Sequence, residues 1–113
     1  GKALGTRAIF TERVDGKMTF RRGFSLREGE RVLIVEDIVT TGGSIKEVID
    51  VVKAAGAVPV AVSMLVDRSG GKATFGDVPA TALLTMDVET YTPEHCPLCA
   101  KGIPMTKRGR TGK

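Results

Sequence analysis

The sequence has no tryptophan, one tyrosine and four phenylalanines, so aromatic residues make up only 4% of its 113 residues. We therefore expect a core of aliphatic side chains, and the fourteen glycines predict many tight turns. Long apolar runs are also missing. The longest, Val58 to Val66, contains Pro59 and Ser63 and is far shorter than the ~20 residues that span a membrane. No charged-then-apolar leader opens the sequence, so we expect a cytoplasmic protein with no membrane partner.

Acidic residues are absent from residue 101 onward. That stretch holds five basic residues: Lys101, Lys107, Arg108, Arg110 and Lys113. The whole chain has 17 basic and 13 acidic residues and a formal net charge of +4, so residues 1–100 keep 12 basic and 13 acidic groups and a net charge of −1. Nucleic-acid binding across the domain is therefore not expected. We divide the chain into a core at residues 1–92 and an irregular segment with a basic tail at residues 93–113.

Two apolar runs with an amphipathic stretch between them predict a βαβ unit. Residues 31–37 include four consecutive aliphatic residues, which indicates a strand buried on both faces, as in a parallel sheet. A helix follows, because its apolar residues share one face: Ile45, Val48, Ile49, Val52 and Ala55. Gly56 is expected to end this helix, residues 58–66 to form the second strand, and residues 81–86 a further short strand.

The N-terminal residues predict a different pattern. Residues 1–5 are typical of the last turn of a helix that closes on a glycine. The apolar run Arg7–Phe10 favours a short strand. Asp15 and Gly16 favour a tight turn before the alternating residues 17–21, so we expect a hairpin or flexible flap there.

The most informative segment follows the first apolar strand. Glu36 and Asp37 stand at its carboxyl end, and a loop of hydroxyls and glycines then leads into the helix. Free N–H groups at a helix N-terminus bind anions, most often phosphate. Carboxylates repel a phosphate but accept hydrogen bonds from the hydroxyls of a ribose, or hold a metal beside it. The combination therefore points to a phosphorylated sugar.

A simpler interpretation is a solvated strand end followed by a helix-capping loop. Either half alone favours that interpretation. Both halves together, at the carboxyl end of a parallel strand where α/β folds bind ligands, favour a functional site. The loop is not a Walker A loop, because it lacks the Gly-Lys-Ser/Thr ending and the acids precede it.

This segment resembles the phosphoribosyl diphosphate (PRPP) signature of the type I phosphoribosyltransferases. Three further stretches, Arg7–Arg13, Arg21–Phe24 and Val66–Gly71, narrow the resemblance to the bacterial orotate phosphoribosyltransferases. The resemblance covers nearly the whole chain. It implies an α/β fold with a mostly parallel sheet flanked by helices and a flexible hairpin loop, incomplete in this chain.

The resemblance also implies a reaction, in which orotate and PRPP, with Mg²⁺, give orotidine 5′-monophosphate and pyrophosphate in pyrimidine (UMP) biosynthesis. Asp37 is implied as catalytic, Glu36 and Asp37 as holding the ribose hydroxyls, and Thr40 to Ser44 as wrapping the 5′-phosphate. Thr40 and Arg68 match positions that contact orotate. The whole PRPP segment would be Glu36, Asp37, Ile38, Val39, Thr40, Thr41, Gly42, Gly43 and Ser44.

In this family, cations from a mobile loop meet the pyrophosphate, often at the neighbouring subunit's site, which implies a homodimer. The matching segment here is Thr11 to Phe24. Lys17 is our candidate for the catalytic loop lysine and Arg13 the second candidate for contacting PRPP. A solvated basic hairpin is the competing interpretation of these residues.

Cys96 and Cys99 form a CxxC pair beside His95. Such a pair is half of a structural zinc site, which two chains could complete as a Cys₄ centre. Inert reduced thiols and a disulfide are the alternatives. A redox pair would be expected at the start of a helix that follows a strand, a context that the sequence does not indicate.

Two other functions compete with the enzyme that the resemblance implies. One is a phosphoribosyltransferase acting on another base, such as a purine. The other is a PRPP-sensing regulator that binds nucleic acid through its basic tail. The resemblance also implies a C-terminal portion that lacks an N-terminal hood and a first βα unit. We therefore expect the sheet to expose apolar area and an open edge, and the 113-residue chain to be weakly stable and inactive unless it pairs with another chain.

Overall fold

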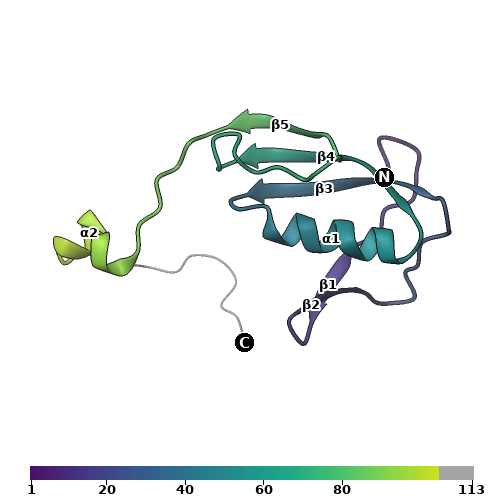
Figure 1. The fold of residues 1–113 in the computed structure, drawn as a ribbon, viewed down its shortest axis with the longest axis horizontal. Coiled ribbons are helices and arrows are strands. Elements are labelled where there is room, and N and C mark those ends of the chain that lie inside the picture. Colours follow the sequence, from purple (N-terminus) through teal and green to yellow (C-terminus); the bar gives the residue numbers. More distant parts are fainter. Residues whose placement is uncertain (105–113) are drawn as a thin grey trace.

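A computed structural model of the chain describes residues 1–104. Figure 1 shows a parallel sheet with one helix packed beneath it, a separate hairpin, and a C-terminal segment that leads away from the sheet to a short helix. The elements are β1 (Thr11–Val14), β2 (Lys17–Phe20), β3 (Arg31–Val39), α1 (Gly43–Ala54), β4 (Val58–Asp67), β5 (Ala80–Thr85), a 3₁₀ turn η1 (Pro93–His95) and α2 (Pro97–Ala100). No helix among the described residues is long and apolar enough to cross a membrane.

The predicted βαβ unit is confirmed. β3 and β4 pair in parallel on either side of α1 in the sequence, and β5 adds a third parallel strand in the order β3-β4-β5. Ile34 lies opposite Val62, and Glu36 lies opposite Met64. β3 ends at Val39, two residues later than predicted, so the strand continues beyond the two acids.

The core lies between α1 and one face of the sheet. Ile45, Ile49 and Val52 of α1 are buried against Ile34 and Val62 of the strands. Full burial of such side chains contributes roughly 1.5–3 kcal/mol each. α1 ends at Ala54, so Ala55 lies beyond the helix and is exposed.

The other face of the sheet is open, so the prediction that residues 31–37 are buried on both faces was wrong. Side chains alternate along a strand, and those opposite the core residues remain exposed: Leu33 by 42%, Val35 by 70%, Leu65 by 55% and Leu83 by 82%. The physical reason is that the one helix packed on this sheet covers one face only. β3 is also an edge strand within the described part of the chain.

The predicted hairpin is present. β1 and β2 pair antiparallel, and Asp15 and Gly16 between them have φ values of 49° and 81°. Two positive φ angles define the type I′ turn, whose twist suits a two-residue hairpin.

The strand predicted at Arg7–Phe10 was wrong, because these residues are irregular and the strand begins at Thr11. No strand among the described residues pairs with them. Side chains hold the segment instead. The Arg7 guanidinium donates to the Ser25 carbonyl at 2.9 Å and binds Glu30 at 2.7 Å, while the Phe10 ring meets Phe24 edge to face.

Residues 1–6 have the hydrogen-bond pattern of a helix C-terminus. Thr6 N–H donates to the Gly1 carbonyl and Gly5 N–H to the Lys2 carbonyl, with Gly5 at φ 60°. α1 ends with the same pair of bonds around Gly56, whose φ is 76°.

Candidate functional site

The loop between β3 and α1 forms an open cradle at the helix N-terminus. Gly42 precedes the helix in the left-handed conformation, no side chain caps the helix, and its first turn has no acidic residue. A helix start without such a cap leaves backbone N–H groups free to bind an anion. A pocket of about 150 Å³ occupies this position, lined by Glu36 and by residues 38–45.

Position 42 requires glycine for two reasons, its backbone conformation and the space around it. Its φ is 79°, which disfavours any side chain, and a Cβ atom would lie 2.8 Å from Cε1 of Phe75. Phe75 is buried in the core, so it has little room to move away. No local pattern of residues indicates this contact, because Phe75 lies more than thirty positions further along the chain.

The two carboxylates stand in different electrostatic environments. The Asp37 carboxylate accepts the Ile38 N–H at 2.7 Å, and this bond is the main reason that the pKa of Asp37 lies below its usual value. Partial desolvation, with the neighbouring Asp37 as a further cause, raises the pKa of Glu36. Neighbouring carboxylates with pKa values pushed in opposite directions leave Asp37 as the more firmly ionised group.

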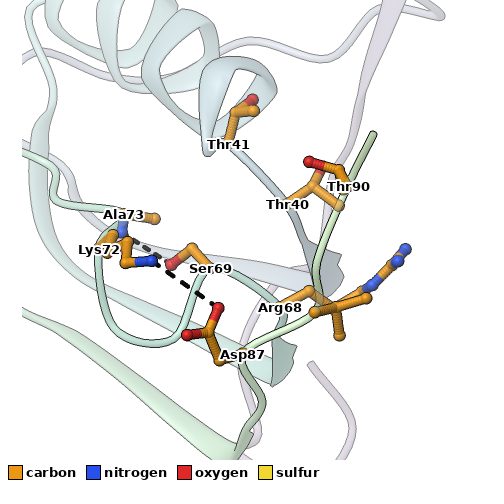
Figure 2. Close-up of a pocket in the computed structure, with 9 residues that line it drawn as sticks. Thr40, Thr41, Arg68, Ser69, Lys72, Ala73, Asp87 and Thr90 are labelled. Carbon is orange, nitrogen blue, oxygen red and sulfur yellow. Dashed lines mark hydrogen bonds and ion pairs between the residues drawn. The ribbon is translucent and has the colours of Figure 1, made fainter. Parts of the chain in front are cut away.

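A second pocket, of about 330 Å³, lies beside the cradle and is shown in Figure 2. Its lining residues come from three loops: Thr40, Thr41, Arg68, Ser69, Lys72, Ala73, Asp87, Val88 and Thr90. Thr40 and Arg68, both predicted from the resemblance to contact orotate, therefore line one pocket. A backbone bond of 2.8 Å from Arg68 N–H to the Val39 carbonyl ties the ends of β3 and β4 together. Thr40 and Thr41 line both pockets, so the two are adjacent.

Asp67 organises the loop that carries Arg68, a role that the sequence analysis missed. Its buried carboxylate accepts hydrogen bonds from the Ser69 N–H (2.8 Å), the Ser69 hydroxyl (2.6 Å) and the Gly71 N–H (3.1 Å). These bonds hold the pKa of Asp67 below its usual value, with the Ser69 hydroxyl as the main cause. The run Asp67-Arg68-Ser69-Gly70-Gly71 is a turn signal that could have predicted this anchor.

Lys72 and Asp87 complete the wall of the second pocket and form an ion pair of 3.8 Å. In Figure 2 the side chain of Arg68 extends away from this pair. Arg68 makes no ion pair with any residue in the described range, so the ordinary salt bridge that a surface arginine usually forms is not found.

The structure separates the two predicted loop cations. The Arg13 guanidinium binds Glu47 of α1 through two hydrogen bonds of 2.9 and 3.0 Å. These bonds are the main reason that the pKa of Arg13 is raised. Lys17 lies exposed at the start of β2 and lines neither pocket of the site. Arg13 is thus attached near the helix start, whereas Lys17 is not brought to the site.

The CxxC pair lies apart from both pockets, in the segment after β5. Both thiols are free, and among residues 1–104 no cluster of three or more His, Cys, Asp or Glu side chains could hold a metal ion. His95, the third ligand considered from the sequence, has its Nδ1 atom 2.9 Å from the Thr92 hydroxyl. The zinc site predicted at Cys96 and Cys99 thus finds no third ligand in this part of the chain. Four of the five basic C-terminal residues, from Lys107 onward, lie outside the described residues.

Comparison with known proteins identifies the family. A model described as "Phosphoribosyl transferase domain" matches residues 5–76, which include the cradle and the Arg68 loop. The chain is 58% identical over 108 residues to a protein named orotate phosphoribosyltransferase from Desulforamulus reducens, and 55% identical over 108 residues to one of the same name from Caldicellulosiruptor saccharolyticus. Each match covers 96% of this chain and 56% of the relative, so the chain spans about half the length of the curated relatives it matches.

Solved structures show the same fold at lower identity. The adenine phosphoribosyltransferase of Thermoanaerobacter pseudethanolicus superposes with a TM-score of 0.55 at 21% identity, over 73% of this chain and 51% of that one. The enzyme of that name from Rhodothermus marinus gives a TM-score of 0.52 at 22% identity, over 73% and 52%. With the family model matched across both loops of the site, the chain belongs to the phosphoribosyltransferase family.

Proposed function

We propose that this chain carries the PRPP and orotate sites of an orotate phosphoribosyltransferase. The reaction transfers the phosphoribosyl group from PRPP to orotate and releases orotidine 5′-monophosphate and pyrophosphate, as a step of pyrimidine biosynthesis. The names of the relatives support orotate as the base. The observation that carries the proposal is that the two pockets lie next to each other and share Thr40 and Thr41 in their walls.

The cradle suits the 5′-phosphate of the ribose. Backbone N–H groups at the start of α1 and the hydroxyls of Thr40, Thr41 and Ser44 would donate hydrogen bonds to its oxygens. No carboxylate lies in the first helical turn to repel it. Gly42 and Gly43 let the phosphate approach the backbone closely.

The two acids at the end of β3 suit the ribose itself. A firmly ionised Asp37 accepts hydrogen bonds from sugar hydroxyls and stabilises positive charge as the ribose becomes oxocarbenium-like. Glu36 lines the cradle and would accept a second hydroxyl. No covalent step by the protein is needed, because leaving-group departure and base attack proceed by positioning and charge stabilisation.

The second pocket suits the base. Arg68 offers a planar guanidinium that can bind a carboxylate through two parallel hydrogen bonds, which fits the carboxylate of orotate. Because Arg68 has no ion-pair partner among the described residues, its charge is available to a ligand. Adenine has no carboxylate, so an arginine at this position favours orotate over a purine.

The donor set also fits Mg²⁺ brought by PRPP. The side chains of Glu36 and Asp37 offer carboxylate oxygens, and Mg²⁺ is commonly held by one or two carboxylates together with substrate phosphates. Such an ion would neutralise charge on the pyrophosphate leaving group. The described residues offer no larger cluster that would bind a metal without substrate.

The hairpin supplies the remaining charge in this proposal. Arg13 would exchange Glu47 for pyrophosphate, and Lys17 would act as the loop lysine that meets the leaving group. Closing the loop over the site of a second subunit would make the active form a homodimer.

Calorimetry of the 113-residue chain with PRPP and Mg²⁺ tests the sugar-phosphate site directly. Turnover is tested in a chimera in which this chain replaces the matched 108 residues of the Desulforamulus reducens relative, supplied with orotate, adenine or hypoxanthine. We expect consumption of orotate alone. Turnover of a purine instead would reject the assignment of the base, and absence of PRPP binding in both proteins would reject the site.

The role of Asp37 is tested in the same chimera. Asp37→Asn keeps the shape but removes the charge, and we expect a loss of turnover of at least about 100-fold, in line with the loss of one electrostatic contact in a transition state. Asp50→Asn, on the exposed side of α1, is the matched control and should leave turnover unchanged. Parental turnover in Asp37→Asn would defeat the ribose-holding role.

A further inference from the structure

The CxxC pair is the one sequence motif that the proposed function does not use. Cys96 and Cys99 lie in the segment after β5, and neither lines the cradle or the second pocket. Cys96 is half-buried and Cys99 is exposed, and both are free thiols. The pair is therefore accessible to small reagents, which a purely structural pair of packed thiols would not be.

The local backbone brings the two cysteines together. Cys96 directly precedes α2, and the Ala100 N–H donates to its carbonyl at 3.0 Å, so Cys96 and Cys99 are one helical turn apart. The Cys99 N–H also donates to the Cys96 sulfur at 3.4 Å. Side chains three residues apart on a helical turn are neighbours, with Cβ atoms roughly 5–6 Å apart, so closing a disulfide would draw these atoms to roughly 3.5–4.5 Å.

A helix does start at the motif, which the sequence did not indicate, although a 3₁₀ turn and not a strand directly precedes it. Pro97 occupies the first position of α2, where proline is favoured. The signal was present in the sequence, but α2 has only four residues and no apolar periodicity to reveal it.

The two thiols are not equivalent. Hydrogen bonding from the Cys99 backbone is the main cause that lowers the pKa of Cys96, whereas the Cys96 side chain is the main cause that raises the pKa of Cys99. The ionisable neighbours are few: His95 is bound to Thr92, and Tyr91 is hydrogen bonded to Glu89. The asymmetry supports division into an attacking thiol and a resolving thiol.

We propose that Cys96 and Cys99 form a reversible dithiol–disulfide pair that exchanges with small-molecule disulfides. Zinc held by one chain is not favoured, because the described residues provide no third ligand, so a zinc site would need the four thiols of two chains. The geometry favours an exchanging pair over inert thiols, because Cys99 is exposed and the Cys96 sulfur accepts the Cys99 N–H.

The exchange proceeds in two balanced steps with a small-molecule disulfide as oxidant. The Cys96 thiolate attacks one sulfur of that disulfide, forms a mixed disulfide and releases one thiolate. The Cys99 thiol then loses its proton to solvent and attacks the Cys96 sulfur, which closes the intramolecular bond and releases the second thiolate. Two electrons pass from the cysteine pair to the oxidant, and a small-molecule dithiol reverses both steps.

The test treats the 113-residue chain with glutathione disulfide and follows it by intact-mass spectrometry. We expect the parent chain to lose two hydrogens with no adduct, and dithiothreitol to restore the original mass. Cys99→Ser should stop at one glutathione bound to Cys96. Cys96→Ser should form an adduct at least several-fold more slowly, because the slower thiol remains.

Iodoacetamide at neutral pH gives an independent measure in the unoxidised parent chain, with peptide mapping to locate the label. We expect Cys96 to be alkylated first. Equal rates at the two cysteines, a stable double adduct in the parent chain, or one zinc ion per two chains with all four thiols protected would each overturn the proposal. Far-UV circular dichroism of each variant separates these outcomes from loss of the fold.

Discussion

The two faces of the parallel sheet are built from neighbouring aliphatic residues, yet one face is buried and the other is exposed to solvent. Ile34 and Val62 are 5% and 1% exposed beneath α1, whereas the adjacent Val35 is 70% exposed on the other face. Composition therefore does not distinguish the faces. Only the presence of a covering element does, and the site is built where the covered face ends, at the loops that follow β3 and β4.

The difference teaches where the stability of this chain resides. Burial under α1 removes apolar area from water, while the open face leaves a row of aliphatic side chains in solvent that contributes little to folding. An exposed apolar patch of this kind marks a surface suited to contact with other protein. The expected weak stability of the chain alone follows from the same observation.

Deleting a side chain on the covered face should have the largest effect. Ile49→Ala removes buried methyl groups from the α1 side of the core, and we expect the free energy of unfolding to fall by about 2–4 kcal/mol. Leu83→Ala on the open face is the matched control and should change it by less than about 0.5 kcal/mol. Urea denaturation measures both, and equal losses would show that the open face is covered in solution.

The loop that joins the covered face to the site should respond next. Gly42→Ala places a Cβ atom against Phe75 in a left-handed backbone, and we expect a loss of about 1–3 kcal/mol in thermal unfolding. Gly43→Ala is the control, since its nearest contact would be an ordinary 3.6 Å and its φ is not positive. Comparable losses in both variants would remove Phe75 as the cause.

Asp67 is an exception to the difference between the two faces. Its position along β4 places it on the open face, yet it is only 6% exposed because its own loop covers it. Its folded pKa lies below the usual value, so its ionised form stabilises the fold above the unfolded pKa. That stabilisation is lost as the pH falls through the lowered folded pKa. We expect unfolding midpoints measured at decreasing acidic pH to fall less steeply in Asp67→Asn than in the parent chain. Identical slopes would argue against an ionised anchor.

The smallest effect on stability should come from making the open face polar. In the double variant Val35→Thr/Leu65→Thr we expect the free energy of unfolding to change by less than about 0.5 kcal/mol, because both side chains are exposed. Binding of a hydrophobic dye should fall clearly, because the apolar patch is interrupted. Unchanged dye binding would place the dye elsewhere on the chain.

Periodicity predicted the elements but not their surroundings. The spacing of Ile45, Ile49 and Val52 located α1 and its buried face, and the aliphatic runs located β3 and β4. A run of aliphatic residues cannot tell whether a second layer covers it, so the run at residues 31–37 wrongly predicted a strand buried on both faces. For the same reason the apolar run at Arg7–Phe10 predicted a strand that has no pairing partner in the described chain. The exposed apolar area was expected only from the resemblance, as the result of a missing strand.

For the site as well, local patterns predicted some residues and left others unpredicted. Local signals indicated the acids of β3 and the glycine loop, because strand end, hydroxyls and helix start are contiguous in the sequence. The contact of Gly42 with Phe75 and the approach of Arg68 to Thr40 depend on long-range packing, which no local pattern encodes.

The loop fixed by Asp67 has a consequence for how a ligand would be held. Its backbone is already ordered by three hydrogen bonds to one carboxylate, so most of its conformational entropy is lost during folding rather than on ligand binding. A ligand in the second pocket would therefore bind Arg68 on a backbone that loses little further conformational entropy. Loosening this anchor should therefore weaken binding through a less favourable entropy, while the contacts themselves, and the enthalpy they supply, stay much as they are.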